Sequence, residues 1–168
     1  SATPAIAVAF LPWRGAAEHR TVMETLSRRM AVGVITRDRD SGEVRVGKDG
    51  EPTVHYTISQ RDAAHLHSGI EGAARILEAA GADSLVTGHQ TGRAWTRGES
   101  LDAWLGEARR VGYQPGRCTM AALHIMGSAR MGGDRTSSAV DPDGASWEVP
   151  NVVVADASLF PTSSGVNP

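Results

Sequence analysis

The pattern that decides the fold at the C-terminal end of the sequence lies in the stretch Asn151-Val152-Val153-Val154-Ala155-Asp156-Ala157-Ser158-Leu159-Phe160-Pro161. Residues 152–155 form a short continuous apolar run, which is typical of a strand buried on both faces. The run stops at Asp156, and the carboxyl ends of such strands commonly open onto a ligand crevice. We therefore expect a buried strand that presents Asp156 to a ligand.

The sequence closes on Gly165-Val166-Asn167-Pro168. Asparagine is a good N-cap for a helix, and proline is preset for the first helical position. Asn167 and Pro168 therefore predict the start of a helix that the sequence does not contain. Because the chain also begins with Ser1 and not with methionine, we expect it to be a piece of a longer protein.

A further motif lies upstream, at His124-Ile125-Met126-Gly127-Ser128-Ala129-Arg130-Met131-Gly132. His-x-x-Gly-Ser-x-Arg-Met-Gly, followed by Val-x-Asp-x-Ser-x-Phe-Pro-Thr and Gly-Val-Asn-Pro, resembles the C-terminal signature of the GMC oxidoreductases, the FAD-dependent alcohol oxidases and dehydrogenases. The segment 141–149 most resembles the long-chain fatty alcohol oxidase branch. Residues 1–123 resemble the substrate domain of the family only loosely, and Ala129 stands where related sequences often carry cysteine.

This resemblance implies an enzyme that oxidises a CH–OH group, with a long-chain or otherwise apolar primary alcohol as the favoured substrate. His124 would accept the hydroxyl proton while hydride passes to flavin N5, because an imidazole with a pKa near neutrality can take and return a proton. Asn167 would be the second catalytic residue and would also lie at the cofactor. Asp156 and Ala157 would contact the ribityl and pyrophosphate region of FAD.

Each of these residues also has a purely structural interpretation. A histidine in the setting Ala-Leu-His-Ile is more often a core histidine with one hydrogen bond. Helix capping alone can explain Asn167, and the Asp156 carboxylate can cap the turn that follows it. For His124 and Asn167, the match to all three motifs favours the catalytic interpretation.

No Gly-x-Gly-x-x-Gly fingerprint follows any predicted strand, whereas GMC proteins carry one near their N-terminus. We therefore predict two parts: residues 1–123 from the substrate domain, and residues 124–168 with the catalytic histidine motif and a truncated return into the FAD-binding domain. The expected partners are the alcohol and the missing N-terminal FAD-binding portion, from the same gene or a separate chain. Alone, the chain is expected to be inactive and to bind FAD weakly or not at all. The alternative is a non-catalytic ligand-binding or subunit-interaction module derived from the substrate domain.

The composition narrows the class of protein further. Seventeen basic and nineteen acidic residues give a net charge of −2, which gives no reason to expect a nucleic acid or an anionic membrane as partner. No run approaches the roughly 18 apolar residues of a membrane-spanning helix, so we expect a soluble protein without a stable membrane anchor. The compartment stays open, with the cytoplasm favoured. Cys118, the single cysteine, is interpreted as a small buried residue. His65 and His67 stand two apart on a predicted helix and cannot chelate one ion, so no metal site is predicted.

The order of the predicted elements favours an α+β fold, with an antiparallel sheet and helices packed on one face. Val44 and Val46 alternate with polar residues between two turn clusters, which predicts the middle of a three-stranded antiparallel meander. Met23, Met30 and Trp104 fall at helical spacing and are interpreted as core residues. The predicted strands are 6–11, 31–37, 44–46, 53–58 and 83–87, the predicted helices are 16–30, 60–80 and 101–111, and 91–98 is predicted as a loop.

Overall fold

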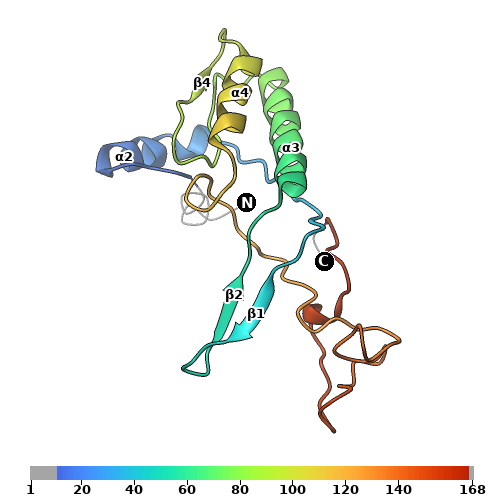
Figure 1. The fold of residues 1–168 in the computed structure, drawn as a ribbon. Helices are drawn as coiled ribbons and strands as arrows, with labels where there is room; N and C mark the ends of the chain where they lie inside the picture. Colours follow the sequence, from blue (N-terminus) through green and yellow to red (C-terminus); the bar gives the residue numbers. More distant parts are fainter. Residues whose placement is uncertain (1–10, 167–168) are drawn as a thin grey trace. The chain divides into compact units, whose positions relative to one another are not determined.

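The structure is a computed structural model that describes residues 11–166 (Figure 1). The predicted α+β class is confirmed, because the described helices accompany two antiparallel two-stranded sheets. The predicted strand at 6–11 falls outside the described residues except for Leu11. Within 11–166, none of the helices combines the length and the apolar character needed to cross a bilayer. The elements are α2 (Ala16–Glu24), the 3₁₀ helix η1 (Leu26–Arg28), β1 (Glu43–Val46), β2 (Pro52–His55), α3 (Gln60–Ala79), β3 (Ser84–Leu85), β4 (Trp95–Thr96), α4 (Leu101–Val111) and the 3₁₀ helix η2 (Ala157–Leu159).

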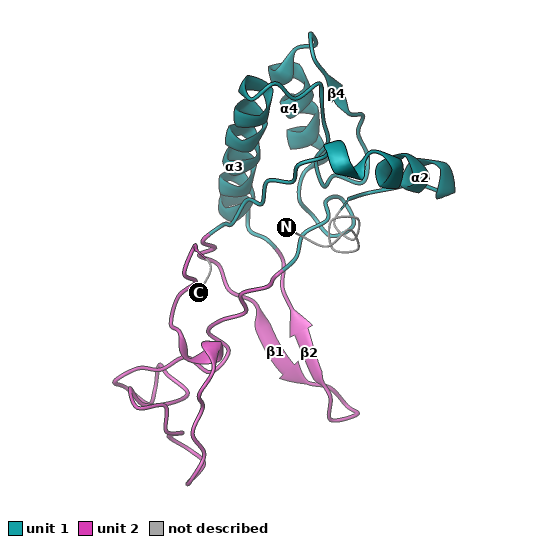
Figure 2. Ribbon diagram, turned by 180° about the vertical axis from the view of Figure 1, so that it is seen from behind, with its two compact units in different colours: residues 1–36, 58–121 teal, residues 37–57, 122–168 magenta. Residues whose placement is uncertain are grey.

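The chain divides into two compact units (Figure 2). The first unit consists of residues 1–36 and 58–121 and carries α2, η1, α3, β3, β4 and α4. The second unit consists of residues 37–57 and 122–168 and carries β1, β2 and η2. Each unit therefore joins two separate stretches of sequence. Which domain of a complete enzyme each stretch belongs to stays a prediction.

The helix α3 begins and ends at signals that are visible in the sequence. The Ser59 hydroxyl accepts a hydrogen bond from the backbone N–H of Asp62 at 3.1 Å, which caps the first turn. At the other end, Gly81 has a φ of +97° and the Ala82 N–H donates to the Leu77 carbonyl at 3.0 Å. This is a Schellman ending, in which glycine takes the left-handed position at no steric cost. The predicted helix and its terminal glycine are confirmed.

The apolar face of α4 forms much of the core of the first unit. Ser100 caps this helix by accepting the Ala103 N–H at 3.2 Å. The predicted apolar stripe is buried, because residues three and four apart lie on one side of a helix. The stripe is Leu101, Trp104, Leu105 and Ala108. The buried core comprises Ala74, Leu85, Trp95, Leu101, Trp104 and Leu105, with Ile70, Leu77 and Ala82 packed against it.

One strand of a short pair lies where the sequence predicts a loop, whereas its partner β3 lies within the strand predicted at 83–87. β3 and β4 pair antiparallel, with Leu85 opposite Trp95. The Trp95 side chain is 1% exposed, and its indole N–H donates to the Glu99 carbonyl at 3.1 Å. The loop prediction for 91–98 was therefore wrong at 95–96. Two residues are too few for a periodic pattern, so this strand depends on tertiary pairing.

The first predicted helix ends earlier than expected, and part of its apolar stripe is exposed. α2 stops at Glu24 and is followed by η1. The Thr25 hydroxyl donates to the Thr21 carbonyl at 2.6 Å, and hydroxyls that bond to the backbone in this way weaken the helical ladder. Met23 and Met30 are exposed, so their interpretation as core residues was wrong.

Only two strands of the predicted meander form. β1 and β2 pair antiparallel with Val44 opposite Val54, and all their residues are exposed. Residues 31–37 contain no strand, so that part of the prediction was wrong. Val34 instead packs against Gly69 of α3, where a Cβ atom would overlap its side chain. Strand propensity depends on context, and here the apolar side chain is used against a helix.

Candidate active site

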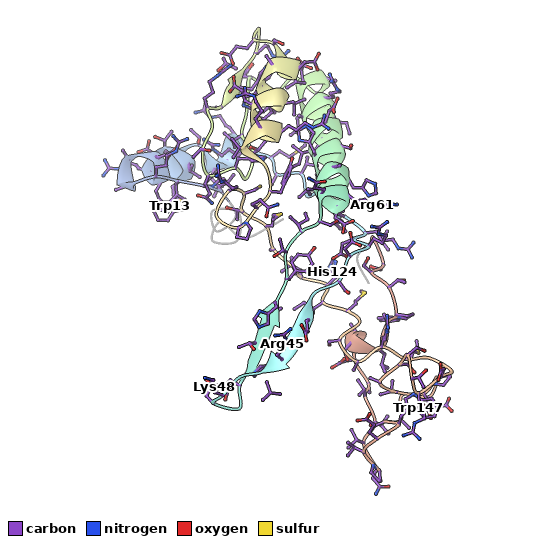
Figure 3. The ribbon with its side chains drawn as sticks, in the orientation of Figure 1. Trp13, Arg45, Lys48, Arg61, His124 and Trp147 are labelled. Carbon is purple, nitrogen blue, oxygen red and sulfur yellow. The ribbon has the colours of Figure 1, made fainter. Side chains whose placement is uncertain are left out.

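His124 lies on an irregular segment of the second unit, at a bend outside every helix and strand (Figure 3). The residue is half-buried, while its neighbours Leu123 and Ile125 are exposed. Within residues 11–166, the imidazole has no hydrogen-bond partner. A core histidine is typically buried and hydrogen-bonded, whereas His124 is only half-buried and makes no hydrogen bond within the described residues. Both ring nitrogens therefore have hydrogen-bonding capacity available for another molecule.

The structure brings the first two sequence motifs side by side. The Ala129 N–H donates to the Ser158 carbonyl at 3.1 Å, and the Met131 N–H donates to the Leu159 carbonyl at 2.9 Å. The turn between His124 and this contact needs a glycine at residue 127, which has a φ of +81°. The backbone thus joins the histidine motif to the motif that contains Asp156.

Asp156 caps the short 3₁₀ helix η2. Its carboxylate accepts the Ser158 N–H at 2.8 Å, and Ala157 is the half-buried first residue of the helix. Hydrogen bonds from Ser158, through its side chain and its backbone N–H, hold the pKa of the Asp156 carboxyl below its usual value. The capping interpretation left open by the sequence is therefore realised. Contact of Asp156 and Ala157 with a cofactor stays a prediction.

The predicted buried strand at 152–155 is not observed. Val152 is exposed and Val153 is 64% exposed, and Val153 makes only an isolated bridge with Ala145. The Val154 N–H donates to the Gly144 carbonyl at 2.9 Å. The apolar run predicts that the segment is buried, but it does not identify the element that the segment packs against. No sheet within residues 11–166 contains it.

Local hydrogen bonds hold the loop between the two motifs. The Asp141 carboxylate accepts the N–H groups of Asp143 and Ala145, both at 2.9 Å. Such bonds stabilise tight turns without helix or sheet. The indole N–H of Trp147, labelled in Figure 3, donates to the Ser138 hydroxyl at 3.0 Å. The segment that resembles the long-chain fatty alcohol oxidases is thus an ordered loop.

A hollow of about 280 Å³ lies next to the joined motifs in the second unit. The Arg37 guanidinium, far away in the sequence, donates to the Thr162 hydroxyl at 3.3 Å, and the Ser163 hydroxyl donates to the Asp38 carbonyl at 3.0 Å. No sequence motif pointed to Arg37, because its place at the site depends on a contact across most of the chain. The hollow is lined by Arg37, Met126, Phe160, Thr162, Ser163 and Ser164.

Asn167, predicted as the second catalytic residue and as a cofactor contact, lies outside the described residues. Gly165, two residues before it, lies close to the Arg37 side chain. A Cβ atom at Gly165, which has a φ of +72°, would lie 3.1 Å from the Arg37 Cβ. A glycine at this place therefore permits both the left-handed conformation and the close approach.

The residues at the hollow fit part of an FAD molecule. Its volume lies just below the roughly 300–1,000 Å³ of sites for small ligands, so it can hold a portion of a dinucleotide and not the whole. Met126 and Phe160 are apolar and suit a flat ring, while the hydroxyls of Thr162, Ser163 and Ser164 can bond its polar edge. The phosphates need a glycine-rich turn, which the sequence lacks.

Comparison with known proteins matches residues 38–168 to the GMC oxidoreductase family. The chain is 31% identical over 169 residues to the long-chain-alcohol oxidase FAO4A of Arabidopsis thaliana, covering 98% of this chain and 23% of that protein. It is 34% identical over 165 residues to the long-chain-alcohol oxidase FAO3 of the same plant, covering 94% of this chain and 22% of that protein. It is also 41% identical over 64 residues to the gluconate 2-dehydrogenase flavoprotein of Pantoea cypripedii, covering 38% of this chain and 10% of that protein.

The chain therefore spans less than a quarter of the length of the two plant oxidases. No solved structure matches it. The family match covers both motifs that the backbone joins and reaches the final Gly-Val-Asn-Pro. On these grounds the chain belongs to the GMC oxidoreductase family.

Proposed function

We propose that this chain is the C-terminal part of an FAD-dependent oxidoreductase that oxidises long-chain or otherwise apolar primary alcohols. One observation carries the proposal. The histidine motif and the Asp156 motif, separated in sequence, are hydrogen-bonded side by side in a chain whose relatives over nearly its whole length include long-chain-alcohol oxidases.

His124 is the residue that accepts the hydroxyl proton in this proposal. A half-buried imidazole without a partner among the described residues can turn one nitrogen toward a substrate hydroxyl. Oxidation of the alcohol to an aldehyde removes one proton from oxygen and one hydride from carbon. His124 takes the proton, and a positioned base of this kind contributes about 10²–10⁴-fold to the rate. FAD, when bound, supplies the acceptor for the hydride.

Asn167 orients the substrate in the same proposal. Its side-chain amide can donate a hydrogen bond to the alcohol oxygen, which fixes the hydroxyl proton toward His124. This role is compatible with a helix that starts at Asn167, because the side-chain oxygen can accept the capping hydrogen bond while the NH₂ group still has two donors for the alcohol.

Asp156 and the hollow supply part of the cofactor site. A carboxylate offers about four acceptor positions, so the hydrogen bonds from Ser158 leave capacity for a ribityl hydroxyl. Ala157 stands at the start of η2, beside that carboxylate. The lining of Met126, Phe160 and residues 162–164 accommodates a flat, partly polar ring. These residues hold and orient the cofactor, while the glycine-rich turn for its phosphates comes from the missing N-terminal portion.

The missing N-terminal FAD-binding portion is the partner in this proposal, and residues 124–168 are its return segment. Leu123, Ile125, Val152 and Val153 are all exposed. We infer that these side chains belong to a surface that another part of the enzyme covers. Because the plant oxidases are more than four times as long as the matched region, we assign the additional polypeptide to that role.

The substrate class can be tested with a series of primary alcohols of increasing chain length and the complete protein. Each buried methylene contributes about 0.8 kcal/mol, which corresponds to about fourfold in kcat/KM. We expect aldehyde formation with kcat/KM rising over several methylenes and then levelling off. Equal kcat/KM for ethanol and a long-chain alcohol would contradict the assignment. Alcohol binding without any aldehyde would instead support a non-catalytic ligand-binding module.

A further inference from the structure

Three buried rings of the first unit meet where three segments of the chain come together. His67 lies on α3, His89 follows β3, and Tyr113 follows α4. They are 7%, 4% and 5% exposed. His67 Nδ1 and the Tyr113 hydroxyl share a hydrogen bond of 2.8 Å, and the rings of His89 and Tyr113 pack edge to face with centroids 5.1 Å apart. We call these three residues the His–Tyr–His cluster.

The surroundings of His89 favour the neutral ring over the protonated one. Its Nδ1 shares a hydrogen bond of 2.8 Å with the Thr87 hydroxyl, which can donate or accept. Its Nε2 is buried and has no hydrogen-bond partner in the described chain. Protonation would place an N–H on both nitrogens, and the Nε2–H would carry part of a buried charge without an acceptor. Burying such a group is costly.

The charges around the cluster act mainly against protonation. Burial lowers the pKa of His67, the Arg109 guanidinium on α4 lowers it further, and the Glu71 carboxylate acts in the opposite direction. Burial also lowers the pKa of His89, and His67 adds to this effect.

The Tyr113 hydroxyl of the cluster and the nearby Cys118 thiol stay neutral around pH 7. Burial raises the pKa of the Tyr113 hydroxyl and raises the pKa of the Cys118 thiol to about 11. Within the cluster and this thiol, only the two histidines can therefore gain a charge as the pH falls below neutrality.

The sign of the pH effect follows from these shifts. In the closed state, with the three rings packed as described, the pKa of each histidine is lowered. Below the ordinary histidine pKa of about 6.5, each histidine therefore binds fewer protons in the closed state than in an open state, in which its ring is exposed to solvent. The stability that closure provides is therefore complete above about pH 6.5 and decreases as the pH falls toward the lowered values. At one pH unit below the ordinary pKa, each histidine raises the equilibrium constant for opening by up to about tenfold.

Two backbone segments beside the cluster are hydrogen-bonded to each other. The Gln90 N–H donates to the Arg117 carbonyl at 2.9 Å, and the Thr119 N–H donates to the Gly88 carbonyl at 2.7 Å. His89 and Cys118 form the bridge between these bonds. Thr119 lies five residues before His124, so the segment fixed here leads directly into the histidine motif.

We propose that the His–Tyr–His cluster is a pH-sensitive latch, which holds 113–119 against α3 and 87–90 when both histidines are neutral and releases that segment when they are protonated. The latch closes above the ordinary histidine pKa and opens below it. It acts on the anchoring of the segment that precedes His124.

Hydrogen–deuterium exchange of the full 168-residue chain tests the latch, with rates corrected for the intrinsic pH dependence of amide exchange. The reporters are the amides of Gln90 and Thr119, and the Leu105 amide in α4 is the internal reference. Between about pH 7.5 and about pH 5.5, we expect reporter protection to fall by up to about tenfold for each histidine, and by more than the reference.

Three variants separate the latch from general acid sensitivity. His89→Gln and His67→Gln keep a polar side chain that cannot be protonated, and each should reduce the pH-dependent loss of protection. His65→Gln changes an exposed histidine of the same helix and should retain the wild-type pH dependence. The proposal is overturned if wild-type protection does not change with pH, or if both buried variants keep the full wild-type loss. The wild-type result decides the matter even if a buried variant fails to fold.

Discussion

Replacing His124 with alanine in the complete enzyme is expected to slow reduction of the bound flavin by about 10²–10⁴-fold, because a positioned general base is lost. Flavin content should stay at the wild-type level, since no hydrogen bond of His124 to the described chain is lost. The measurement is anaerobic stopped-flow reduction of the flavin by a saturating long-chain primary alcohol. Under saturating alcohol, a loss of rate reports on the chemical step and not on substrate affinity.

A matched control is His55→Ala, which removes an exposed histidine on β2 of the same unit. This variant should reduce its flavin at the wild-type rate. If His124→Ala also keeps that rate from about pH 6 to about pH 9, across the range where a histidine base titrates, then His124 does not accept the proton and its catalytic assignment is wrong.

Replacing Trp95 with alanine is expected to lower the free energy of unfolding by about 3–5 kcal/mol. The side chain is 1% exposed and belongs to the core of the first unit, so its removal leaves a cavity and loses the hydrogen bond to the Glu99 carbonyl. The measurement is chemical denaturation of the full chain followed by circular dichroism, which does not depend on the indole that is removed.

Trp13→Ala is the control for that substitution, because Trp13 is 50% exposed. A surface change of this kind is expected to cost about 0.5 kcal/mol or less. Equal losses for the two variants would show that Trp95 does not form part of the core in solution.

The parts of the fold that the sequence predicts correctly depend on local signals. Ser59 and Gly81 mark the ends of α3 because capping involves only neighbouring backbone groups. The buried stripe of α4 follows from the period of a helix. These signals act within a few residues, so no knowledge of the tertiary structure is needed to use them.

The errors concern elements that depend on distant partners. An apolar run such as 152–155 predicts burial, but neither sheet within residues 11–166 contains it. Val34 is used against Gly69 of α3 and not in a sheet. The short strand at Trp95 forms only because Leu85 lies opposite. Strand formation is a property of pairs, and a single stretch of sequence does not contain its pair.

In the candidate site, too, the residues with local sequence signals were predicted and those that depend on distant contacts were not. His124 and Asp156 stand out in the sequence through their motifs, and capping by Asp156 follows from the residue type. No sequence pattern pointed to Arg37, because its hydrogen bond to Thr162 joins two residues that are far apart in the sequence. The pairing of His67 with Tyr113 likewise joins a helix to a distant loop, and the sequence alone offered only the neighbouring histidines at 65 and 67.

The flavin absorbance of the complete protein under anaerobic conditions tests the central claim most directly, with the isolated 168-residue chain measured beside it. The account predicts that the complete protein binds FAD and that a long-chain primary alcohol bleaches its absorbance. It also predicts that the isolated chain, which lacks a phosphate-binding glycine turn, binds FAD weakly or not at all. Stoichiometric FAD binding by the isolated chain, or a complete protein whose flavin no alcohol reduces, would contradict the account.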